Sequence, residues 1–203
     1  MEFKYFEQPE KFTAYTAAKT TCNVCQQTKH CFDAEAFYGE DRLSAICPEC
    51  LASGALQAYD ITTCEGDMEE LIRQLQAIHP DLSTDEVTSL AQGTTDVLEK
   101  TTPHPMSWQD WSWPCADGDY CRFIGYGSKF LYNQLARDKD GARLFQQSLY
   151  YTVKDEEDAE ELWEEYMPAK SIKNYEASLE YDPLFYVFKS LTDHRIITVW
   201  DAS

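Results

Sequence analysis

The chain has 203 residues and a formal charge of −19 at neutral pH, with 36 acidic against 17 basic side chains. This length suits one domain, or one domain with a small module, and a hydrophobic content of 43% is enough to form a core. An acidic balance of this size repels nucleic-acid phosphates and anionic lipid surfaces, so we expect neither nucleic acid nor membrane as a partner.

The most specific motif is a pair of Cys-x-x-Cys sequences in the first quarter of the chain. They contribute Cys22, Cys25, Cys47 and Cys50. Two cysteines three residues apart fit one tight turn, so two such pairs can offer four thiolates to one tetrahedral Zn²⁺ ion. The sequence therefore predicts a structural zinc site in a zinc-ribbon-like module at residues 21–60, with two short strands and a turn between the pairs.

Three alternatives to this ligand set remain open. His30 and Cys31 lie between the pairs and could each replace one cysteine. A redox-active pair needs a strand before the motif and a helix starting at it, within a βαβ unit. A disulfide framework needs an oxidising compartment, whereas the first residues lack the basic start and apolar run of a signal peptide and no segment is long enough to span a membrane. We therefore expect a cytoplasmic protein with reduced thiols.

Two amphipathic helices are predicted after the module. Residues 67–79 carry apolar side chains on one face, and Asp67 is placed to cap the helix. A second, short helix is expected to begin at Ser83 and to end before Gly93. Their apolar faces are typical of core packing.

An aromatic loop follows, with Trp108, Trp111 and Trp113 close together. Tryptophan packs well in cores and is also favoured at the centre of protein interfaces, so this loop is either part of the core or a candidate binding surface.

The last third of the chain is predicted to contain both helices and strands. The pattern predicts a strand at residues 121–125, helices at 128–137 and 155–165, and a C-terminal hairpin built from 184–188 and 196–200. Together the elements predict an α+β fold, a single compact domain over residues 1–203 with the zinc-ribbon-like module embedded in it.

The helix predicted at 155–165 is acidic on its outer side. The acidic residues of interest are Glu156, Glu157, Glu160 and Glu161. Such a face is usually only solvated, but it is also the best local candidate for contact with a basic protein, because opposite charges steer association.

No arrangement typical of catalysis is visible. A Cys–His site could draw only on Cys115, Cys121, His104 and His194, and no local signature surrounds these cysteines. No phosphate-binding glycine loop and no Gly-x-Ser-x-Gly motif occurs. We therefore expect a protein that is not an enzyme.

Several motifs, spread over most of the chain, resemble those of the CbrC family of small bacterial proteins. They are an aromatic N-terminal segment, Cys47–Gly54, Thr102–Pro103 followed by Trp108–Gln109, Trp113-Pro-Cys115-Ala-Asp117, Phe123–Gly125, and a C-terminal stretch from Tyr186 to Asp201. The family pattern has a further Cys-x-x-Cys pair and a glycine after Thr-Pro, where this chain has Ser190, Asp193 and His104. A second metal site is therefore not expected here.

The resemblance implies a role in tolerance of bacterial toxins, as an antitoxin-like or immunity protein. Combined with the acidic surface, it leads us to expect a protein that neutralises a basic cognate toxin domain by occluding it. The alternative is a zinc-stabilised adaptor or regulatory protein that binds an endogenous basic partner.

Overall fold

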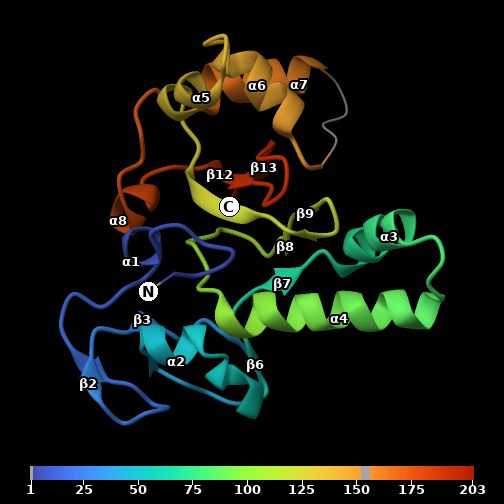
Figure 1. The fold of residues 1–203 in the computed structure, drawn as a ribbon. Coiled ribbons are helices and arrows are strands. Elements are labelled where there is room, and N and C mark those ends of the chain that lie inside the picture. Colours follow the sequence, from blue (N-terminus) through green and yellow to red (C-terminus); the bar gives the residue numbers. More distant parts are fainter. Residues whose placement is uncertain (1, 152–155) are drawn as a thin grey trace.

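A three-stranded antiparallel sheet lies at the centre of the protein (Figure 1). The computed structural model describes residues 2–151 and 156–203, without the side chains of residues 156 and 157. The strands are β11 (Arg122–Tyr126), β12 (Leu184–Lys189) and β13 (Ile196–Asp201), with β12 in the middle. β12 and β13 pair in register and confirm the predicted C-terminal hairpin.

Both faces of β12 are buried, which explains its unbroken apolar sequence. Successive side chains of a strand point to opposite faces. Leu184, Tyr186 and Phe188 therefore enter the larger of two hydrophobic cores, whereas Phe185 and Val187 enter the smaller one. A strand buried on both faces reads as a continuous apolar run rather than an alternating one.

Three short helices cover the face of the sheet that carries the smaller core (Figure 1). They are α5 (Lys129–Leu135), α6 (Gly141–Ser148) and α7 (Glu156–Glu161), which continues into the π-helical turn η2 (Leu162–Tyr166). The Ser128 hydroxyl accepts a hydrogen bond from the Leu131 N–H and so caps α5, which lies within the helix predicted at 128–137. Tyr132, Phe145 and Trp163 pack edge-on or tilted against one another beneath these helices.

The opposite face is covered by the N-terminal segment and by the aromatic loop: the rings of Phe6 and Phe12 pack against Phe123, and those of Trp111 and Trp113 pack against Tyr186 and Phe188. Two longer helices, α3 (Met68–Ile78) and α4 (Thr84–Thr101), pack against each other. The prediction for α3 is confirmed, since the Asp67 side chain accepts from the Glu70 N–H. The capping box that starts α4 at Ser83 is also present.

The predicted end of α4 at Gly93 is wrong, because the helix continues to Thr101. A Cβ at Gly93 would meet nothing within 4 Å, so this glycine lies on the exposed side of the helix. A glycine there costs about 1 kcal/mol relative to alanine. Burial of Thr95 and Leu98 beyond it favours continuing the helix.

The predicted metal module is built from very short elements at one end of the molecule (Figure 1). They are β1 (Thr20–Thr21), β2 (Thr28–Lys29), β3 (Phe32–Asp33), β4 (Tyr38–Gly39), β5 (Ala45–Ile46), α2 (Pro48–Ala52), the 3₁₀ turn η1 (Ala55–Ala58) and β6 (Ile61–Thr62). The strands pair as β1–β2, β3–β5 and β4–β6, each over two residues. Ladders this short contribute few hydrogen bonds, so the module depends mainly on side-chain packing.

The remaining elements are short and lie outside the module and the three-stranded sheet. They are α1 (Pro9–Phe12), β7 (Glu65–Gly66), β8 (Ser112–Trp113), β9 (Cys115–Ala116), β10 (Asp119–Tyr120) and α8 (Tyr175–Ser178). The larger core includes Phe32, Ile46 and Leu51 of the module together with Phe123 and Phe188 of the sheet. The module is therefore packed into the rest of the protein.

Candidate metal centre

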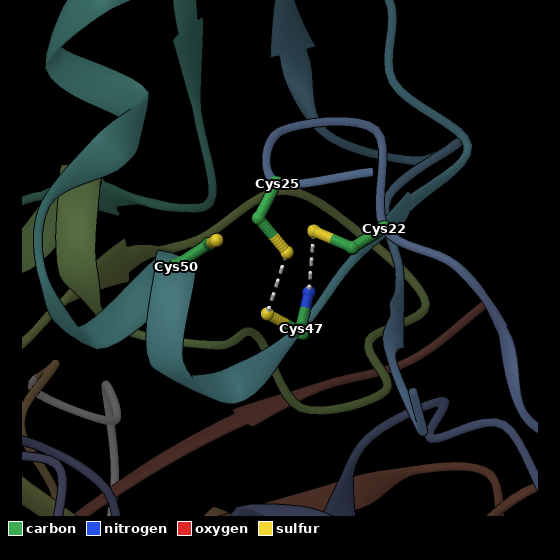
Figure 2. Close-up of side chains that lie close together, drawn as sticks. All are labelled: Cys22, Cys25, Cys47 and Cys50. Atoms are coloured by element: carbon green, nitrogen blue, oxygen red, sulfur yellow. Dashed lines mark hydrogen bonds between the residues drawn. The ribbon is translucent and has the colours of Figure 1, made fainter. Parts of the chain in front are cut away.

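Four cysteine side chains converge between the β1–β2 loop and the start of α2 (Figure 2). They are Cys22, Cys25, Cys47 and Cys50, and their sulfur atoms all lie within 4.8 Å of one another. The Sγ atoms of Cys25 and Cys47 are 3.8 Å apart, and all eight cysteines are free thiols. A tetrahedral zinc ion with Zn–S bonds of about 2.3 Å needs sulfur atoms about 3.8 Å apart. The cluster is therefore close to the geometry of a four-thiolate site.

The first pair is held by a tight turn and by one asparagine. Gln26 adopts a left-handed conformation with φ 58°, and its N–H donates to the Cys22 carbonyl over 2.9 Å. The side-chain oxygen of Asn23 accepts from the backbone N–H groups of Ser44 and Ala45 at 2.9 and 2.8 Å. Asn23 thus ties the turn of the first pair to the strand that leads into the second.

The second pair is positioned by the first turn of α2. Cys47 precedes Pro48 at the start of the helix, and its carbonyl accepts from the Leu51 N–H at 3.0 Å. The Cys47 N–H donates to the Cys22 sulfur at 3.3 Å (Figure 2). One backbone group therefore connects the two pairs directly.

The electrostatics of the cluster favour a cation among the sulfurs. Burial raises the pKa of Cys47 above its ordinary value and that of Cys50 to about 11. Burial also acts on Cys22, but backbone N–H groups, including those of Cys25 and Cys47, outweigh it and lower the Cys22 pKa to about 7. The raised pKa values keep Cys47 and Cys50 protonated at neutral pH, and a divalent cation among the sulfurs would stabilise their thiolate forms.

His30 and Cys31 lie outside the cluster. The His30 Nδ1 is 3.0 Å from the Thr16 carbonyl oxygen, and its ring stacks on Tyr15. Cys31 is buried and its thiol donates to the Lys29 carbonyl at 3.6 Å. Among the described residues, the four paired cysteines are the group close enough to hold a metal ion.

The redox and disulfide alternatives gain no support from this geometry. β5 and α2 do provide a strand and a helix around Cys47, but β5 pairs antiparallel with β3 rather than within a βαβ unit. Four sulfurs converge instead of two, and none is bonded to another.

The aromatic loop is held largely in the core. Trp113 is fully buried and its Nε1–H donates to the Cys121 carbonyl at 2.8 Å, so Trp113 is withdrawn from the expected contact surface. Trp111 is partly buried, with its ring centroid 4.7 Å from that of Tyr186. Trp108 is 36% exposed, and its Nε1–H donates to the Tyr181 carbonyl at 2.9 Å.

The acidic helix presents part of its charge to solvent. Ala159, Leu162 and Trp163 face the smaller core or its edge and are buried, whereas Glu160 and Glu161 are exposed. The side chains of Glu156 and Glu157, also expected to contact a partner, lie outside the described residues.

The fold and the cysteine cluster define a small α+β protein with a candidate four-thiolate metal centre. Over residues 1–196 the chain matches the Uncharacterised protein family (UPF0167), and it belongs to this family. The match confirms the resemblance to the CbrC family that the motifs indicated. No solved structure matches the chain. In the described part of the chain, none of the helices has the length and apolarity that a membrane crossing requires.

Proposed function

We propose that Cys22, Cys25, Cys47 and Cys50 hold one structural Zn²⁺ ion. Four thiolates that gather within 4.8 Å form a closed, sulfur-only ligand set, which suits zinc and leaves no coordination position for a substrate. The metal would stabilise a module whose strands pair over only two residues each, because its binding free energy is folding free energy.

We further propose that the protein is an immunity protein that binds a basic bacterial toxin domain and occludes it. The observation that carries this proposal is an acidic-rimmed apolar hollow beside α7. The hollow, of about 400 Å³, is lined by Leu162, Tyr166 and Trp200, with Asp158 and Glu161 at its edge. Neither carboxylate forms an ion pair within the described residues.

This arrangement suits a partner that presents an apolar side chain next to a lysine or arginine. Tyr166 is 45% exposed and offers an aromatic contact at the mouth of the hollow. Attraction between the acidic rim and a basic partner would raise the association rate, and burial of the apolar anchor would slow dissociation. A cytoplasmic location would place the protein where a toxin acts on its own cell.

The alternative is an adaptor that uses the same surface for an endogenous basic protein. Affinity capture of the tagged protein from its native cells, with metal analysis of the same sample, separates the two. Recovery of a basic toxin domain, with about one zinc per chain, supports immunity only if the purified protein also inhibits that toxin's activity at equimolar ratio. A housekeeping partner, or a toxin that stays active when bound, favours the adaptor.

A further inference from the structure

A second cavity lies where the metal module meets the aromatic loop and is separate from the cysteine cluster. It has a volume of about 270 Å³ and is lined by residues of β6, β7 and the C-terminal part of α4. These three elements lie together in Figure 1. The side chains that matter for its chemistry are Tyr38, Cys64, Glu99, His104, Asp110 and Trp111. An adjoining hollow of about 260 Å³ shares Tyr38 and His104 with it.

Glu99 gives this cavity a partly buried carboxyl group whose negative charge is only partly compensated by neighbouring groups. Its Oε1 accepts one hydrogen bond, from the Gly66 N–H at 3.1 Å. It forms no ion pair within the described part of the chain, because the neighbouring Lys100 directs its ammonium to the carbonyls of Tyr59 and Ile61 at 3.2 and 2.7 Å. Burial raises the pKa of Glu99, and a nearby cation would stabilise its charged form.

Asp110 adds a second carboxylate at the outer side of the cavity. Its Oδ1 accepts from the Tyr38 hydroxyl at 2.8 Å, which holds the carboxylate beside another residue that lines the cavity. Among the described residues that line the cavity there is no lysine or arginine. A third carboxylate, Glu65, also borders it.

The remaining groups around the cavity bring no positive charge. Burial lowers the pKa of His104 to about 4, so its imidazole is neutral at neutral pH. Burial raises the pKa of Cys64, which keeps this thiol protonated. The rings of His104 and Trp111 lie with centroids 5.5 Å apart and form an aromatic wall.

We propose that this cavity binds a small organic cation, an amine or a guanidinium compound, between the carboxylates of Glu99 and Asp110. Carboxylates pair with the cationic group, and the Trp111 side chain, which lines the same cavity, can pack against its carbon chain. Anions are repelled by the same carboxylates. A metal ion is disfavoured, because the donor atoms around the cavity do not form a group within 4.8 Å of one another in the described structure.

The test is calorimetric titration of the full, metal-loaded chain with three probes. Putrescine and agmatine supply an amine and a guanidinium, and 1,4-butanediol is the neutral analogue of putrescine. We expect one saturable site for at least one cation and no binding of the diol. Which cation binds more tightly identifies the headgroup.

Variants localise the binding. Glu99→Gln keeps an oxygen acceptor for the Gly66 N–H and should weaken cation binding about tenfold, the loss of one ion pair in a partly buried site. Asp110→Asn tests the same pairing at an exposed position, where the fold is not at risk. Glu69→Gln makes the same charge change on the exposed surface of α3 and should leave affinity within about twofold.

Three results would overturn the proposal. One is equal binding of the diol and the cations. Another is unchanged affinity in both cavity variants. The third is no saturable cation binding up to about 10 mM, a dissociation constant too weak for a built site. None of these outcomes bears on toxin binding or on the zinc site, so this proposal fails or stands on its own.

Discussion

At the residue scale, Asn23 helps to join the two cysteine pairs. Its side-chain oxygen accepts from two backbone N–H groups and from the Ser44 hydroxyl. We expect Asn23→Ala to lower the free energy of unfolding by about 1–3 kcal/mol, because the Ala45 N–H would lose its partner in a buried position. Asn23→Asp keeps the acceptor and serves as the control. Equal urea-unfolding curves for the two variants would show that this acceptor does not matter.

His104 predicts a pH dependence of stability. Its pKa is about 4 in the folded protein, because burial disfavours the charged ring, against about 6.5 in an unfolded chain. Between these values the unfolded state holds one more proton, so the free energy of unfolding falls as pH falls, by up to about 1.4 kcal/mol per pH unit. Urea titrations from pH 7 to pH 4.5 give the free energy of unfolding of the wild-type protein and of His104→Gln. The difference between the two should change with pH by this slope. Parallel stability profiles would refute a buried neutral imidazole.

At the element scale, α4 shows where a local sequence signal misleads. Gly93 resembles a helix end, yet the helix passes through it, and the burial of Thr95 and Leu98 beyond it favours this continuation. We expect Gly93→Ala to stabilise the protein by about 0.5–1 kcal/mol, since the new Cβ meets nothing within 4 Å.

The matched control is Gly118→Ala. Gly118 has φ +80°, and a Cβ there would lie 2.8 Å from Ile78 Cδ1, so this variant should destabilise. Thermal unfolding of both variants decides the point. If Gly93→Ala is neutral or destabilising, the glycine has a role that the packing does not show.

The acidic face of α7 gives a prediction for the proposed partner. Glu160→Lys with Glu161→Lys should slow association with a captured basic partner at least about tenfold and flatten its dependence on salt, while dissociation changes less. The control is the double variant Glu69→Lys with Asp96→Lys. It makes the same change in net charge at exposed positions of α3 and α4, away from the hollow. If both double variants associate equally fast, the helix is only a solvated face.

At the scale of the whole molecule, the features that depend on residues close in sequence could be predicted, whereas those that depend on distant segments could not. Local signals identified the four cysteines, the caps at Asp67 and Ser83 and the C-terminal hairpin, because a turn or cap depends on residues close in sequence. The burial of Trp113 and the cavity that joins Cys64, Glu99 and His104 depend on segments far apart in the chain. No periodicity carries that information, so the sequence left the loop open between core and surface and missed the cavity.

The continuity of the core makes metal removal a test of the whole molecule. Ile46 and Leu51 of the module share the larger core with Phe123 and Phe188 of the sheet, so loosening the cysteine cluster should also weaken packing on the sheet. We expect a strong zinc chelator to lower the unfolding temperature by about 10 °C or more, equivalent to roughly 4 kcal/mol in a protein of this size. Amide exchange should rise in β12 as well as in residues 21–60. Faster exchange confined to the module would mean that the metal stabilises only the module. An unchanged melting temperature would show that the metal has no structural role.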